Sequence, residues 1–237
     1  MGLMMRVRFV RRRLRAKMAV LAVAIASITS LVSAAPANSA VGPDAVSFFR
    51  AAQIDDARSI KPILARGLDP NSREPERGET GMIVALRHDS MRVFNLLLSQ
   101  PNIRLETTAD NGNTALMMAA FKKNRDAVQA LLEKGAQVNR PGWTALHYAA
   151  AAGDTDIMRI LLSHHAYIDA ESPTGVTPLM IAAREGMEDA VKMLLAEGAD
   201  ATLKDRGFKS TAAEFAERAD KPWIAAAIRG HLASVKR

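Results

Sequence analysis

One segment pattern recurs along this chain, and this repetition restricts the possible folds more than any other feature. The clearest copies are GNTALMMAAFKKNRDAVQALLEKG (112–135), GWTALHYAAAAGDTDIMRILL (142–162) and GVTPLMIAAREGMEDAVKMLLAEG (175–198). The aligned threonines of all the copies fall at positions 80, 114, 144, 177 and 211. Their intervals of 34, 30, 33 and 34 residues define a repeating unit of about 33 residues with one shortened connection.

The residues that follow each threonine have the spacing of a short amphipathic helix. Leu146, Ala149 and Ala150 recur at intervals of three and four, which places them on one helical face. After a polar turn, a second helical segment begins, with Val128 and Leu131 on its apolar face in the third copy. A helix pair of this size cannot bury its apolar faces alone, so neighbouring copies must stack on one another. The sequence therefore predicts an all-α solenoid.

Glycine marks the end of several of the second helices. Gly135 and Gly198 stand where a helix usually ends in the left-handed backbone conformation. His165 occupies the equivalent position in the fourth copy, and we expect it to adopt the same turn.

Fainter copies flank the clear ones and are expected to close the stack. The segment from Phe48 to Asn71 keeps both helical segments without the threonine, and the segment from Gly207 to Gly230 lacks the paired leucines. We therefore place the repeat domain at residues 44–233, with a tail at 234–237. Its expected repeats are 44–74 as the N-terminal cap, 75–108, 109–139, 140–171, 172–204, and 205–233 as the C-terminal cap.

These copies resemble the ankyrin repeat, whose T-P-L-H-x-A core is matched by Thr177-Pro178-Leu179 and by Thr144-Ala145-Leu146-His147. The resemblance covers about 190 residues, and several copies in phase make it specific. It implies an ankyrin-repeat solenoid of helix-turn-helix units with short β-hairpin-like finger loops. It also implies a non-enzymatic protein–protein interaction module without a cofactor. The chain is similar to bacterial exported ankyrin-repeat proteins, which include ones that support oxidative-stress enzymes and ones that neutralise toxins as immunity partners.

Residues 1–34 have the order of a secretory signal peptide. Seven basic residues precede the apolar run Met18–Val32, and small residues follow it. This run is shorter than the roughly 20 residues that a membrane-spanning helix needs. We expect cleavage after Ala34, with Ala40 as the alternative, and a short linker at 35–43. The protein is then exported, to the periplasm; if the segment stayed attached, the chain would be a membrane-tethered scaffold.

The charge of the remaining chain argues against a nucleic-acid partner. Subtracting the seven leader bases from the 32 in the chain leaves 25 bases, which balance the 25 acids. A neutral chain gives no electrostatic footprint for nucleic acid, and none for a membrane after signal cleavage. Cysteine is absent, so no disulfide contributes to stability. We expect a monomer that binds another protein.

Among the residues of the clear copies, His147 is the strongest candidate for a catalytic or metal-binding role. It stands three residues after Thr144, where a helix-capping side chain belongs, and the family resemblance implies that structural role. The alternative is a metal-dependent or other hydrolytic site that combines His147 with His164 and His165. No regular ligand spacing supports it, and motifs for other catalytic sites are lacking.

A solenoid of this kind is expected to bind its partner through the concave face formed by the finger loops and the first helices. The resemblance implies that the contacts come from residues around the glycine before each threonine and from the end of each first helix. Carried over by position, the candidate partner-binding residues are Arg77, Glu79, Arg87, His88, Asn111, Asn113, Phe121, Lys122, Trp143, Val176, Arg184 and Glu185.

Trp143 stands out among these candidates because it adjoins the shortened connection. A shorter finger would leave a notch beside Trp143 and Phe121, and an aromatic anchor beside arginine is typical of a binding hot spot. Alternatively, Trp143 folds over the gap and only packs there. The sequence leaves both interpretations open.

Overall fold

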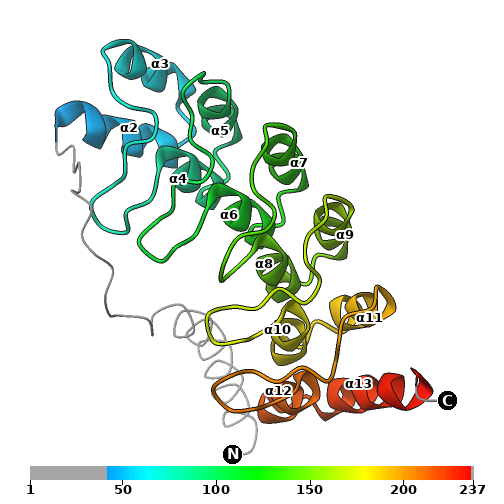
Figure 1. The fold of residues 1–237 in the computed structure, drawn as a ribbon. Coiled ribbons are helices and arrows are strands. Elements are labelled where there is room, and N and C mark those ends of the chain that lie inside the picture. Colours follow the sequence, from blue (N-terminus) through cyan, green and yellow to red (C-terminus); the bar gives the residue numbers. More distant parts are fainter. Residues whose placement is uncertain (1–41, 236–237) are drawn as a thin grey trace, which may run out of the picture. The chain divides into compact units, whose positions relative to one another are not determined.

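The computed structural model describes residues 42–235 of the chain. The predicted signal peptide, its cleavage sites and most of the linker lie outside these residues. The described part is helical (Figure 1), and its only bridge of β type joins Arg73 to Thr80. The helices are α2 (Pro43–Gln53), α3 (Ala57–Ala65), α4 (Gly81–Arg87), α5 (Met91–Leu98), α6 (Ala115–Phe121), α7 (Arg125–Glu133), α8 (Ala145–Ala152), α9 (Thr155–Ser163), α10 (Pro178–Glu185), α11 (Glu188–Ala196), α12 (Ala212–Arg218) and α13 (Pro222–Val235).

The helices form pairs that stack in chain order, which confirms the predicted all-α solenoid. The first helices of the pairs form one layer and the second helices form another layer beside it (Figure 1). Each expected repeat contains one pair, although α2 begins at Pro43 and α13 runs to Val235, slightly beyond the expected domain limits. One continuous apolar core runs through the stack, with Phe48, Leu97, Leu131 and similar side chains fully buried.

The threonines that define the repeat begin the first helices. The hydroxyl oxygens of Thr80, Thr114, Thr177 and Thr211 each accept a hydrogen bond from the N–H three residues later, at 3.3 to 3.4 Å. Such a cap satisfies one of the amides that a helix start leaves without an intrahelical partner. The repeating threonine is therefore explained by helix geometry.

The predicted left-handed positions are also confirmed. Gly135 and Gly198 have φ angles of 95° and 91°, and His165 has a φ of 64°. Glycine adopts the left-handed backbone conformation without steric cost, whereas the Cβ atom of His165 makes this conformation energetically less favourable.

A different glycine is required by packing. Gly81 begins α4, where the other clear repeats have alanine or proline. A Cβ atom at Gly81 would lie 2.4 Å from the Phe48 ring, which fills this space in the first repeat.

The finger loops between the pairs project from the first-helix layer and are hairpin-like, as predicted. In the second repeat, the Glu74 N–H donates to the Glu79 carbonyl at 2.9 Å. Neighbouring fingers are linked where the Asp110 N–H donates to the Arg77 carbonyl at 2.9 Å, and a similar bond at 2.8 Å joins residues 206 and 174.

The shortened connection at residues 140–143 interrupts this row of fingers. Among residues 42–235, no backbone hydrogen bond joins it to either neighbouring finger. Its contact with the third finger is made by a side chain: Arg140 donates from Nη1 to the Gly112 carbonyl at 3.4 Å.

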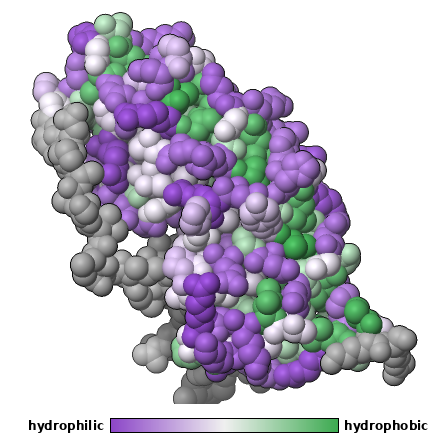
Figure 2. Space-filling model, viewed as in Figure 1, coloured by the Kyte–Doolittle hydropathy of each residue, from purple (hydrophilic) through white to green (hydrophobic). Residues whose placement is uncertain are grey.

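Figure 2 shows that the visible face is mainly hydrophilic, with smaller hydrophobic patches between the helices.

Candidate protein-binding surface

His147 caps a helix and ties two repeats together. The Thr144 N–H donates to His147 Nδ1 at 3.2 Å, which completes a reciprocal capping box with the Thr144 hydroxyl. On its other side, Nε2 lies 2.9 Å from the Val176 carbonyl. A carbonyl can only accept, so Nε2 carries the proton and Nδ1 accepts. Both ring nitrogens are therefore engaged in holding the fold, as predicted.

Burial favours the neutral form of this histidine. His147 is 1% exposed, and desolvation lowers its pKa to about 4, against the smaller opposing effect of its hydrogen bond to Val176. A neutral imidazole is the form that can accept from Thr144 and donate to Val176 at once.

The alternative histidine site finds no geometric support in the described part. His164 and His165 are exposed in the turn after α9, whereas His147 is buried at the start of α8. No three His, Asp or Glu side chains within residues 42–235 lie close enough together to hold a metal ion.

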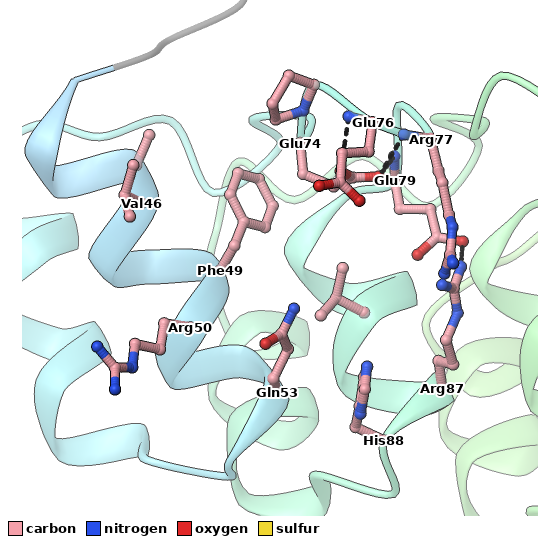
Figure 3. Close-up of a pocket in the computed structure, with 13 residues that line it drawn as sticks. Val46, Phe49, Arg50, Gln53, Glu74, Glu76, Arg77, Glu79, Arg87 and His88 are labelled. Carbon is pink, nitrogen blue, oxygen red and sulfur yellow. Dashed lines mark hydrogen bonds and ion pairs between the residues drawn. The ribbon is translucent and has the colours of Figure 1, made fainter.

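Four of the candidate partner-binding residues meet at one hollow near the start of the stack. Arg77, Glu79, Arg87 and His88 line it together with residues of α2 (Figure 3). We call this hollow the α2–α4 groove; its volume is about 450 Å³, and it lies between α2, the finger at residues 74–79, and α4. These four residues were predicted only from their positions in the repeats, and the fold brings them to one place.

A largely buried ion pair forms one wall of the α2–α4 groove. Glu79 is 3% exposed and its carboxylate pairs with the Arg87 guanidinium, whose side chain is 25% exposed. Figure 3 shows the two side chains facing one another at the edge of the groove. Removing a carboxylate from water is costly unless it is paired, so Arg87 stabilises the finger as well as lining the groove.

The second group of candidates forms an aromatic cluster beside the shortened finger. The Trp143 ring lies edge-on to Tyr148, at 6.5 Å between centroids, and Tyr148 lies edge-on to Phe121 at 6.2 Å. All three side chains are half-buried. The Tyr148 hydroxyl donates to Asn113 Oδ1 at 2.5 Å, and burial raises the Tyr148 pKa to about 12. Trp143 therefore packs on its neighbours while keeping part of its surface open.

Three of the candidates are placed where a partner would not reach their side chains. Glu79, Asn113 and Val176 are 3%, 5% and 8% exposed. Glu79 pairs with Arg87, Asn113 accepts from Tyr148, and the Val176 carbonyl accepts from His147. These positions beside the glycines point inward because their groups form hydrogen bonds and an ion pair within the protein. They therefore support the finger loops and are not themselves contact residues for a partner.

The remaining candidates are accessible to different degrees. Asn111 is exposed at its finger, where its Oδ1 accepts from the Asn113 N–H at 3.1 Å. Lys122 is half-buried and donates to Asp89 at 2.9 Å. Arg184 and Glu185 form an ion pair at 2.9 Å and are about a quarter exposed.

Sequence reasoning missed the contribution of α2 to this surface. Val46, Phe49, Arg50 and Gln53 line the α2–α4 groove, yet the first half copy has no threonine and therefore offered no aligned positions. The available signal was the helical spacing of Val46, Phe49, Arg50 and Gln53, which places them on one side of a helix.

The comparisons with known proteins agree with this architecture. A sequence model described as ankyrin repeats (3 copies) matches residues 48–141 and 137–205. The chain therefore belongs to the ankyrin-repeat family, and its repeats form a protein–protein interaction module.

Similar repeats occur in proteins of very different size. The human transient receptor potential cation channel subfamily A member 1 is 31% identical over 160 residues, 63% of this chain and 14% of that protein. Protein PhlB of Serratia liquefaciens is 37% identical over 107 residues, 44% of this chain and 47% of its own length. The chain spans only 8% to 16% of the length of three curated relatives that it matches.

A solved structure resembles most of the chain. It is described as the predatory endopeptidase Bd0816 from Bdellovibrio bacteriovorus in complex with immunity protein Bd3460, and one of its chains matches with a TM-score of 0.66 and 25% identity. The match covers 78% of this chain and 97% of that chain.

Across residues 42–235, no helix combines the length and apolar character needed to cross a membrane.

Proposed function

We propose that this protein is exported to the periplasm, where it binds a partner protein through the inner face of its stack. This inner face consists of the first helices of the pairs and the finger loops. The observation that carries the proposal is the half-buried cluster of Trp143, Tyr148 and Phe121 beside the shortened finger. Aromatic side chains that keep an open surface while being held rigidly are typical anchors of protein interfaces.

We further propose that the partner is itself an exported enzyme and that this protein is not an enzyme. The resemblance to a structure of an endopeptidase with its immunity protein supports a partner of this kind. The most buried histidine is committed to helix capping, which supports a binding function over a hydrolytic one. The order of the first 34 residues supports export.

Replacing the two accessible aromatic residues should release the partner. We expect Trp143→Ala with Phe121→Ala to reduce recovery of the partner at least 10-fold when tagged protein is purified from the exported fraction, because two anchors each contribute about 1 to 2 kcal/mol. Quantitative mass spectrometry of the captured proteins measures this loss. Tyr167→Ala is the matched control, since Tyr167 is an exposed aromatic residue that belongs to no aromatic pair within residues 42–235.

The melting temperature of each variant separates binding from packing. The proposal expects the double variant to keep its fold and to lose the partner. A large fall in melting temperature with undiminished recovery of the same partner would show that Trp143 only fills the gap beside the shortened finger, and the proposed surface would then be wrong.

A further inference from the structure

The α2–α4 groove has an apolar floor and a rim that is open to solvent. Phe49 and Val84 are 9% and 4% exposed and form part of the core, whereas Val46 is 62% exposed at the rim. The groove volume of about 450 Å³ lies within the range of about 300 to 1,000 Å³ that is usual for sites that bind small ligands. It is large enough for a few side chains of another polypeptide.

The carboxylates at the groove are mostly committed to internal bonds. The Glu74 carboxylate accepts from the N–H groups of Glu76 and Arg77, at 2.8 and 2.7 Å, and more weakly from that of Glu79 at 3.3 Å. Glu79 is paired with Arg87. Glu76 is exposed at the finger and is the remaining acidic side chain of the lining.

The basic side chains of the lining other than Arg87 are not committed in this way. Arg50, Arg77 and His88 are exposed, and none of them forms an ion pair within the part of the chain that the structure describes. Arg50 lies on α2 and Arg77 on the finger, on opposite sides of the groove (Figure 3). In this view the Arg77 side chain lies beside Arg87, whereas the Arg50 guanidinium group points away from the finger. The groove thus offers unpaired donors above an apolar floor.

Building on the proposed function, we infer that the α2–α4 groove binds an extended segment of the partner protein in which an apolar side chain lies next to a carboxylate. The apolar side chain lies on Phe49 and Val84, and burying it provides most of the binding free energy. The carboxylate accepts hydrogen bonds from Arg50 or Arg77, whose planar guanidinium groups suit this geometry. Glu79 repels it little, because Arg87 compensates the charge of Glu79, and the Glu74 oxygens accept hydrogen bonds from N–H groups of the finger itself.

A peptide library tests this inference without knowledge of the partner. Random 12-residue peptides displayed on phage are selected on the purified full-length protein. We expect the selected peptides to share Asp or Glu within two residues of Leu, Ile, Phe or Trp. The strongest of them is then synthesised with a fluorophore, and its dissociation constant is measured by fluorescence anisotropy.

Charge reversal gives the decisive comparison. Arg50→Glu with Arg77→Glu should weaken binding of the acidic peptide at least 10-fold and should permit binding of the same peptide with lysine in place of its acids. The matched control is Arg58→Glu with Lys61→Glu on α3, which changes the net charge equally at exposed positions outside the groove. We expect this control to bind both peptides as the wild type does. Val46→Asp should also weaken binding, because it places a like charge at the rim.

Two results would overturn the inference: selected peptides that lack the acidic and apolar pair, or equal losses in the groove variant and the α3 control. Failure of the inference is distinguishable from failure of the proposed function. Partner recovery that depends on Trp143 and Phe121 but is unchanged by Arg50→Glu with Arg77→Glu would reject this groove and leave the proposed function standing. Recovery unaffected by either pair would reject both.

Discussion

Lowering the pH from 7.5 to 5 is expected to remove about 2 kcal/mol of folding free energy through His147 alone. The folded-state pKa of His147 is about 4 because burial penalises the cation, whereas an unfolded chain has the ordinary value of 6.5. The unfolded state therefore binds more protons between these values. The folding free energy is therefore fully present above pH 6.5. It falls as the pH decreases toward 4, where the loss through His147 reaches about 3 kcal/mol.

Urea unfolding of the wild type and of His147→Met at pH 7.5 and 5.0 measures this contribution. Methionine is the residue at the aligned positions 117 and 180, so the variant suits the architecture. It should be less stable than the wild type at pH 7.5, because the capping bonds are lost, and this difference should shrink by about 2 kcal/mol at pH 5. His164→Asn gives the contribution of an exposed histidine for comparison. Parallel pH profiles for the wild type and His147→Met would contradict a buried neutral His147.

Arg87→Ala is expected to destabilise the protein by about 2 to 3 kcal/mol, because it leaves the Glu79 carboxylate buried without its partner. Glu79 is 3% exposed, and Arg87 is its one ion-pair partner in residues 42–235. The estimate lies below the cost of breaking a fully buried pair, since the Arg87 side chain is 25% exposed and water can enter its place.

Two further variants show whether the charge or the lost packing is responsible. Arg77→Ala removes an exposed arginine from the same finger and should change the free energy of unfolding by less than about 0.5 kcal/mol. Glu79→Gln combined with Arg87→Met removes both charges and should recover most of the loss. If Arg87→Ala unfolds in urea as the wild type does, the carboxylate is not as buried as the structure places it.

The repeating helix pairs could be predicted from the sequence because each rests on local signals. The threonine spacing, the apolar residues at intervals of three and four, and the left-handed positions at Gly135 and His165 are all properties of short segments. Stacking follows from them because a single pair is too small to bury its apolar face. The role of His147 was predictable for the same reason, since a helix cap involves residues three apart.

The candidate site was less predictable, because it depends on contacts between repeats. Family positions indicated Asn113 and Val176 as partner-binding residues, but both are buried. The Asn113 side chain accepts a hydrogen bond from Tyr148, and the Val176 carbonyl accepts one from His147 of the neighbouring repeat. The α2–α4 groove depends on how the first half copy packs against the second finger. Spacing along the chain contains little information about a contact of that kind.

Site-specific photo-crosslinking in cells that produce the protein tests most directly whether the inner face is the binding surface. A benzophenone amino acid would be placed at position 121 or 143 on the inner face, and at the exposed positions 129 or 159 on the outer helices α7 and α9. The account predicts one crosslinked partner of defined mass from positions 121 and 143, and none from 129 and 159. The same crosslinked product from the outer positions, with none from the inner face, would contradict it.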